Sequence, residues 1–238
     1  ELKRQIKEMD IDINLIISSS GYEINLFNPT NFKILYEKKF EFENKVYSVD
    51  FNILNIFLEE NIFKIEKLIG RFIKNITLIL ESDKILNVNI GISKKNYDES
   101  FNSKYFESML VEIKDIFKER YQDQNIMHII IDRYLVDGID YHSFKDILKG
   151  DQVCLEVQLI AIPNNLSLEL DNVLKKYQIK IIRTMDKNYI KNFFKNENEK
   201  FTKMAFQIQS GSNPHEVKIV PKNRVKIGFF EKFFQLFS

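Results

Sequence analysis

The apolar and polar positions of the first 42 residues predict three short strands. Residues 15–17 are a continuous apolar run, and residues 22–27 alternate roughly between apolar and polar side chains after a Ser-Ser-Ser-Gly stretch. A turn at 28–31, which contains Pro29, leads to a third expected strand at 33–42. We therefore expect an antiparallel meander at the start of the fold.

The next segment has a helical period. Apolar residues return every three or four positions between residues 46 and 73, which is typical of an amphipathic helix. Asp50 is a suitable N-cap, and Asn61 or Gly70 is the expected break. Residues 76–80 are short, apolar and rich in β-branched side chains, so they predict a buried strand.

A second group of elements follows. Alternation over 85–92 predicts a strand, and an apolar stripe over 103–121 predicts a helix. Two more strands are expected at 126–136 and 152–162, with Asp137-Gly138 marking a hairpin. This strand, helix, strand, strand order is typical of a compact α+β module.

The last folded elements are a helix, a strand and a helix. Asn164 or Asn165 can cap a helix that runs to Tyr177, and a strand at 179–182 precedes a helix at 189–208. These elements would complete the layer begun by the meander, because a meander with one helix leaves its sheet half covered. The fold class expected is α/β with an α+β insertion.

This organisation predicts five parts of the chain. A first segment of the larger unit, 1–83, is followed by an insertion, 84–162, and by the second segment of that unit, 163–209. A linker with Gly and Pro, 210–225, then leads to a C-terminal helix, 226–238.

Composition excludes several classes of protein. The 35 Lys and Arg residues balance 34 Asp and Glu residues, which argues against a dedicated nucleic-acid binder. A 44% apolar content argues against wholesale disorder. Cys154 is a single cysteine, so it cannot form an internal disulfide, and we expect it on a strand with its side chain in the core. No export signal and no apolar run long enough to span a membrane is recognised, so the cytoplasm is the expected compartment.

The C-terminal segment VKIGFFEKFFQLFS carries the clearest functional signal. On a helix, one arc gathers six apolar side chains, and Glu231, Lys232 and Gln235 face the other way. About 20 Å of helix is too short for a hydrocarbon core of about 30 Å, so the helix would lie on a membrane. The expected membrane-binding residues are Arg224, Lys226, Phe229, Phe230, Lys232, Phe233, Phe234, Leu236 and Phe237. The alternative is that these rings pack on the protein's own core or on a dimer partner.

Three stretches together resemble FtsA, the actin-like bacterial cell-division protein. HIIIDRYLVDG, at 128–138, is similar to a family pattern at His128, Tyr134, Asp137 and Gly138, and Ile131 stands where the family usually has Pro. Residues 155–181 look like the family's following strand, helix and strand, and GFFEKFFQLF looks like its membrane-targeting helix.

The resemblance implies one RNase H-like half of an actin-like fold. The insertion would be the SHS2-like module called 1C. The second half, with its Gly-rich phosphate and adenosine loops, has no counterpart in this sequence. The family's first phosphate loop falls on residues 18–23, where Ser18 replaces the metal-organising Asp and Glu23 stands where a basic residue is common. A plain turn is the favoured interpretation of these serines, although they could donate hydrogen bonds to a phosphate.

No catalytic arrangement is expected. His128, His142 and His215 lack partners at metal-ligand spacing, and His128 is interpreted as a strand residue with a hydrogen-bonded ring. We therefore expect no cofactor, no metal and no enzyme activity.

The resulting hypothesis is a noncatalytic adaptor of the division apparatus, peripheral on the cytoplasmic face of the inner membrane. The resemblance implies partners among division proteins, such as FtsZ or cytosolic segments of membrane division proteins, and possible self-association, with the 84–162 module as the contact surface. In the family the FtsZ tail binds the second half, which this chain lacks. One alternative is half of a split actin-like ATPase. Another is a soluble protein whose Phe-rich tail packs on the protein itself or on a dimer partner.

Overall fold

The computed structural model describes residues 10–95, 103–144, 147, 149–195 and 200–218. The chain divides into two compact units. Unit 1 comprises residues 1–85 and 164–210, and unit 2 comprises residues 86–163 and 211–238. Both units combine helices with a sheet, so the expected mixed α/β class is confirmed.

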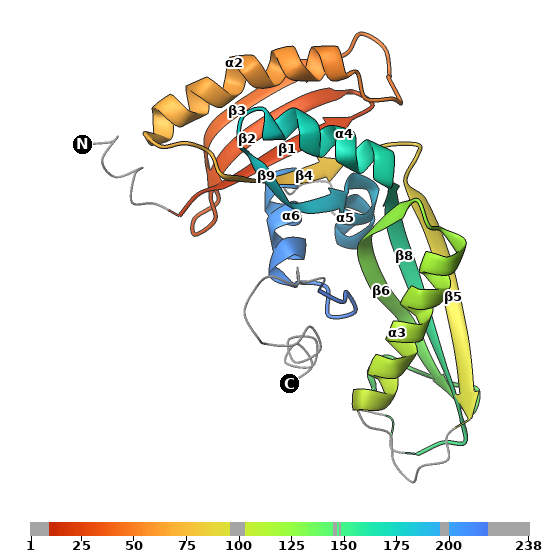
Figure 1. Ribbon diagram of the computed structural model, residues 1–238. Coiled ribbons are helices and arrows are strands. Elements are labelled where there is room, and N and C mark those ends of the chain that lie inside the picture. Colours follow the sequence, from red (N-terminus) through yellow and green to blue (C-terminus); the bar gives the residue numbers. More distant parts are fainter. Residues whose placement is uncertain (1–9, 96–102, 145–146, 148, 196–199, 219–238) are drawn as a thin grey trace. The chain divides into compact units, whose positions relative to one another are not determined.

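Unit 1 is built on a five-stranded sheet in the order β3-β2-β1-β4-β9 (Figure 1). The first three strands form an antiparallel meander, and β4 and β9 join parallel to β1. The expected meander and the strand after the long helix are confirmed. The elements of unit 1 are β1 (Asp12–Ser18), β2 (Gly21–Asn28), β3 (Lys33–Glu41), α2 (Phe51–Ile69), β4 (Asn75–Leu80), α4 (Asn164–Lys175), β9 (Lys180–Asp186), α5 (Lys187–Phe194) and α6 (Phe201–Ser210).

Helices cover both faces of this sheet. The ring of Tyr22 lies 6.2 Å from that of Phe57 on α2, and Phe27, on the opposite face of β2, lies 5.9 Å from Phe206 on α6. Figure 1 shows α2 and α4 along one face, with α5 and α6 on the other. Both faces of β1 and β2 are consequently buried, which explains their nearly continuous apolar sequence.

The ends of α2 follow the expected signals. The Asp50 carboxylate accepts hydrogen bonds from the amides of Asn52 and Ile53, and Gly70 ends the helix in the left-handed conformation at φ 68°. Asn61 does not break the helix. Its buried amide donates to the Phe57 carbonyl and accepts the Tyr36 hydroxyl, so both polar ends are satisfied.

The single helix expected at 189–208 is wrong. Asp186 caps α5 at its start, and α5 ends at Lys195, which has φ 49°. A separate helix, α6, begins at Phe201. The polar run between them offers no apolar side chain to pack on the sheet, so nothing compensates for continuing the helix there.

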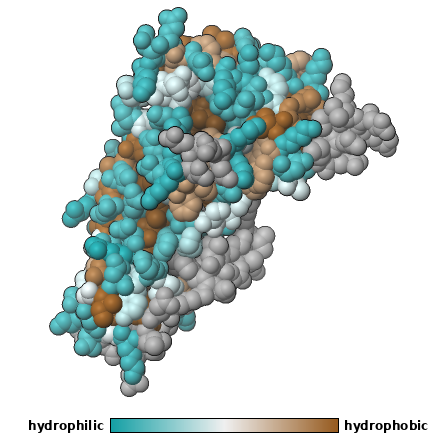
Figure 2. Space-filling view, turned by 180° about the vertical axis from the view of Figure 1, so that it is seen from behind, coloured by the Kyte–Doolittle hydropathy of each residue, from teal (hydrophilic) through white to brown (hydrophobic). Residues whose placement is uncertain are grey.

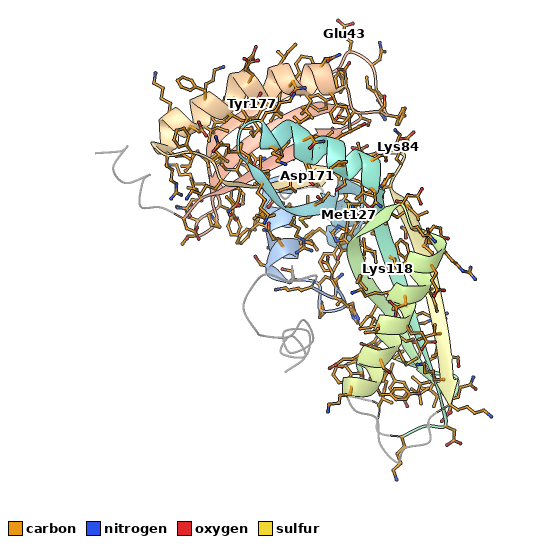
Figure 3. All side chains as sticks on the ribbon, in the orientation of Figure 1. Glu43, Lys84, Lys118, Met127, Asp171 and Tyr177 are labelled. Carbon is orange, nitrogen blue, oxygen red and sulfur yellow. The ribbon has the colours of Figure 1, made fainter. Side chains whose placement is uncertain are left out.

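Unit 2 contains a four-stranded sheet in the order β5-β8-β6-β7, with one helix packed on it (Figure 1). The expected strand, helix, strand, strand succession is present as β5, α3, β6 and β8, and a short further strand, β7, stands between β6 and β8. Figure 3 shows Lys118 on α3 and Met127 on β6. The elements are β5 (Leu86–Lys95), α3 (Ser103–Arg120), β6 (Gln124–Val136), β7 (Ile139–Tyr141) and β8 (Gln152–Pro163).

The core of unit 2 fixes which side of β8 is buried. Val153, Leu155 and Val157 pack with Phe106 and Phe117 of α3. Cys154 has the opposite phase and is only half-buried, so its expected core position is wrong. Burial, followed by the charge of the nearby Glu156, raises the pKa of its thiol, which makes Cys154 a poor nucleophile.

The hairpin expected at Asp137-Gly138 is confirmed. Both residues have positive φ, 51° and 81°, and they connect β6 directly to β7. A two-residue turn of this kind matches the twist of the paired strands.

Exposed apolar side chains are spread over both units. Phe63 and Phe72 in unit 1 and Ile139 in unit 2 are examples. On the face seen in Figure 2, hydrophobic patches are separated by hydrophilic ones. Such scattered exposure is ordinary for a folded surface and by itself indicates no docking site.

Candidate functional site

The carboxyl ends of the three parallel strands of unit 1 meet at one edge of the sheet. Ser19 follows β1, Glu81 follows β4 and Lys187 follows β9. The Ser19 hydroxyl donates to Glu81 Oε1 at 3.1 Å, and Lys187 Nζ donates to Glu81 Oε2 at 2.7 Å. We call Ser19, Glu81 and Lys187 the strand-end network. It ties three strands together through side chains.

The network holds its carboxylate in the charged form. Burial alone would raise the pKa of Glu81, but the hydrogen bond and charge of Lys187, with Ser19 and Lys191, outweigh burial and lower that pKa. Both partners are shielded from water, with 13% of the Lys187 side chain and 27% of the Glu81 side chain exposed. The pair is therefore less screened by solvent than a fully exposed ion pair.

The serine turn next to this network uses its hydroxyls internally. Ser18 Oγ donates to the Gly21 carbonyl at 3.1 Å and lies 3.0 Å from Ser20 Oγ. The Ser19 carbonyl accepts a hydrogen bond from the Val46 amide, and the Ser20 carbonyl accepts one from the Phe42 amide. These bonds favour the plain turn over a phosphate loop, because the donors of Ser18 and Ser19 are already engaged.

Gly21 is required by the geometry of this turn. Its φ is +145°, and a Cβ added there would lie 1.9 Å from the Phe40 carbonyl oxygen. Only glycine allows the start of β2 to approach β3 so closely.

A pocket of about 240 Å³ lies beside the turn. Its lining includes Lys39, Lys187 and Lys191, but Lys39 Nζ lies 3.1 Å from Glu23 and Lys187 pairs with Glu81. A triphosphate entering here would have to displace these carboxylates. The charge pattern therefore suits a closed structural edge better than a polyphosphate site.

His128 is buried and has a partner, as expected. It lies on β6, is 0% exposed, and its Nδ1 is hydrogen-bonded to Glu216 Oε1 at 2.7 Å. Among the residues that the structure describes, no group of three or more His, Cys, Asp or Glu side chains could hold a metal ion. His142 and His215 do not join His128 in a metal site within that part of the chain.

Residues 213–217, expected in a linker, are paired with unit 2. Glu216 forms an antiparallel bridge with Ile130 on β6. The Ile131 amide donates to the His215 carbonyl at 2.9 Å, and the Val217 amide donates to the Ile129 carbonyl at 2.8 Å. Val217 belongs to the unit 2 core. We call residues 213–217 the clip, and over this range the expected linker is wrong.

Sequence reasoning missed Glu81, Lys187 and Glu216. The first two directly follow strands of one parallel sheet, and that position could have identified them, since such strand ends gather at one edge. Glu216 and Val217 stand at the start of a short alternating run after Pro214, which is a weak strand signal.

The residues expected to bind a membrane, from Arg224 to Phe237, lie outside the described residues. None of the helices in the described ranges has the length and apolar character that crossing a membrane requires.

Comparison with known proteins leaves the family open. No family model matches the sequence, and no curated protein matches it. Three solved structures are similar over about three quarters of the chain. The first is the cytoplasmic domain of EpsL, an inner-membrane component of the type II secretion system of Vibrio cholerae, with 9% identity, a TM-score of 0.40, and coverage of 76% of this chain and 59% of that chain.

The second is a PilM-PilN type IV pilus biogenesis complex, with 10% identity, a TM-score of 0.46, and coverage of 76% of this chain and 49% of that chain. The third is a Bacteroides thetaiotaomicron protein with an actin-like ATPase fold and unknown function, with 15% identity, a TM-score of 0.34, and coverage of 79% and 56%. The chain spans between 49% and 59% of the length of these structures.

Proposed function

We propose that this protein is a noncatalytic, membrane-associated adaptor of the bacterial division apparatus, similar to FtsA. Unit 1 would be one RNase H-like half of an actin-like fold, and the inserted part of unit 2 would be an SHS2-like 1C module. The tail from Gly228 to Phe237 would anchor the protein to the cytoplasmic face of the inner membrane.

The topology of unit 1 supports the actin-like assignment. An antiparallel meander is extended by two parallel strands, and the module is inserted between β4 and α4. This arrangement agrees with the half-molecule that the motifs at 128–138 and 155–181 imply.

The strand-end network is the observation that carries the noncatalytic part of the proposal. Catalysis on a nucleotide would need an acidic residue to organise metal and water, together with donors aimed at phosphates. This edge has Ser18 at that position of the turn. The side chains of Ser18, Ser19, Lys39 and Lys187 are engaged by Gly21, Glu81 and Glu23. The edge is therefore suited to holding strands together.

The tail sequence supports the membrane part. It places six apolar side chains on one arc and Lys218, Lys222, Arg224, Lys226 and Lys232 nearby. Each cation close to an anionic leaflet contributes about 1 kcal/mol, and partial burial of several Phe rings contributes a few kcal/mol more. The expected result is reversible binding.

Vesicle co-sedimentation tests the anchor. The full chain, a chain ending at Arg224, and a Phe230→Glu/Phe233→Glu variant would be compared on phosphatidylglycerol–phosphatidylcholine vesicles. We expect both altered chains to bind at least about tenfold more weakly, because each loses apolar burial. The Gln235→Ser variant, changed on the polar arc, is the matched control and should bind like the full chain. Equal binding by all four chains would contradict the proposal.

The division role needs a test in cells. A tagged full chain should form bands at midcell, and a tagged chain without its last thirteen residues should be diffuse. Uniform membrane staining of the full chain would support the anchor and contradict the division role. Partners would then be sought by cross-linking from exposed positions of the module, with FtsZ and the cytosolic segments of membrane division proteins as the first candidates.

A further inference from the structure

The clip decides which part of the protein carries the C-terminal tail. After α6 ends at Ser210 in unit 1, the chain passes to β6 of unit 2, where residues 213–217 pair along the strand. We infer that the clip makes unit 2 the part that is attached to the lipid surface. This inference rests on the proposed function for the lipid, but the clip itself is independent of it.

Three kinds of contact hold the clip. Two backbone hydrogen bonds join it to Ile129 and Ile131, and Val217 is 2% exposed within the unit 2 core. The third contact is the His128–Glu216 hydrogen bond, in which the side chains are 0% and 5% exposed. Removing one of these buried partners is costly, because the other then lacks this hydrogen bond while it is still shielded from water.

The clip also has an internal turn that prepares it for pairing. The side-chain oxygen of Asn213 accepts a hydrogen bond from the His215 amide at 3.0 Å, and the backbone carbonyl of Asn213 accepts one from the Glu216 amide at 3.2 Å. This turn directs Glu216 and Val217 onto β6. The clip is therefore a built element and not an extended stretch that happens to pass the strand.

Opening the clip would change the point of attachment. With the clip closed, the tail would be attached at Val217, about 11 residues before its first ring at Phe229. With the clip open, it would be attached at the end of α6, about 18 residues before Phe229. The tail would then hang from unit 1, and unit 2 would be free of the membrane.

Amide hydrogen exchange without lipid tests the clip. In the unaltered protein, the Ile131 and Val217 amides should be protected. In Glu216→Ala, both should exchange at least about fivefold faster, because the buried hydrogen bond between the His128 ring and the clip is lost. Glu216→Gln should restore much of the protection, since its amide can still bond to the ring. Glu169→Ala, a carboxylate removed from the exposed face of α4, is the matched control and should change neither amide.

A second variant guards against misfolding of unit 2. A chain ending at Ser212 lacks the clip, so its Ile131 amide should lose protection while the Leu155 and Val157 amides of β8 stay protected. Rapid exchange of Ile131 and Val217 in the unaltered protein would overturn the inference. Unchanged exchange of Ile131 in the chain ending at Ser212 would also overturn it.

Energy transfer to labelled vesicles tests the attachment. A donor dye would be placed on unit 2 at an Asn89→Cys substitution in a Cys154→Ser background, with an acceptor lipid in the vesicles. At equal bound fractions, transfer should be lower in a chain whose residues 213–217 are replaced by Gly-Ser-Gly-Ser-Gly, which removes Glu216 and Val217 from β6, than in the parent chain. Equal transfer would overturn the claim that unit 2 is the attached part. If the Ile131 and Val217 amides are protected but no chain binds vesicles, the pairing of the clip with β6 is supported and the proposed membrane function is contradicted.

Discussion

At the scale of single residues, Glu81 contacts two other strand ends of unit 1. It accepts hydrogen bonds from Ser19 and Lys187, and its own amide donates to the Ile17 carbonyl at 2.8 Å. One residue thus joins the ends of β1, β4 and β9. Replacing its carboxylate by an amide would keep the shape and remove the charge that pairs with Lys187.

We therefore expect Glu81→Gln to destabilise unit 1 in a pH-dependent way. The pKa of Glu81 is lowered in the folded protein from its ordinary value of 4.5, so its ionised form stabilises the fold above pH 4.5. That contribution is lost as the pH falls below 4.5 through the lower folded pKa. Because 27% of the side chain is exposed, the difference at pH 7 should be no more than about 1 kcal/mol.

Urea unfolding of the two proteins at pH 7 and at pH 3 measures this difference. The free-energy gap between the unaltered protein and Glu81→Gln should shrink in acid. Glu169→Gln, on an exposed part of α4, should show little gap at either pH. A gap for Glu81→Gln that is independent of pH would contradict the ion-pair interpretation.

At the scale of elements, the start of α2 is fixed by Asp50 in two ways. Its carboxylate caps the first amides of the helix, while its backbone amide and carbonyl both bond to the Tyr22 hydroxyl from β2. The helix cap is therefore attached to the sheet that the helix covers.

Asp50→Ala should lower the stability of unit 1 by about 1 kcal/mol, because two amides of the first turn lose their acceptor. Asp50→Asn keeps an oxygen acceptor and should cost only a fraction of that. Thermal unfolding followed by circular dichroism measures both. If the two substitutions cost the same, the carboxylate's charge and not its capping geometry would be responsible.

At the scale of the whole molecule, the insertion has closely spaced ends. Leu86 at the start of β5 is the register partner of Ala161 near the end of β8. Antiparallel partners lie about 5 Å apart, so the rest of the chain needs only a short bridge where the module is absent. Unit 1 also has its own sheet and its own buried layers.

A chain in which residues 86–163 are replaced by Gly-Ser-Gly, and which ends at Ser210, should therefore fold. We expect helical and strand signals in circular dichroism and one cooperative urea transition. As a control, the same chain with Leu54→Ala, a change in the buried layer under α2, should unfold at lower urea. A chain that shows no cooperative transition would contradict the independence of unit 1.

Local sequence patterns were enough for most elements of this fold. The alternation in residues 22–27 and 85–92, the helical stripe of α2 and the Asp137-Gly138 turn each depend on neighbouring residues and on backbone geometry. The same reasoning failed at 189–208, because a polar interruption within a helical period gives no local sign of where the chain turns.

The sequence by itself thus determined most of the succession of elements and the inserted position of the module, because strands and helices follow local periods of two and 3.6 residues. Only the tertiary structure decided the candidate sites. Glu81 meets Lys187 from 106 residues away, and His128 meets Glu216 from 88 residues away. Such pairs are selected by sheet register and burial, which bring together side chains that no local pattern connects.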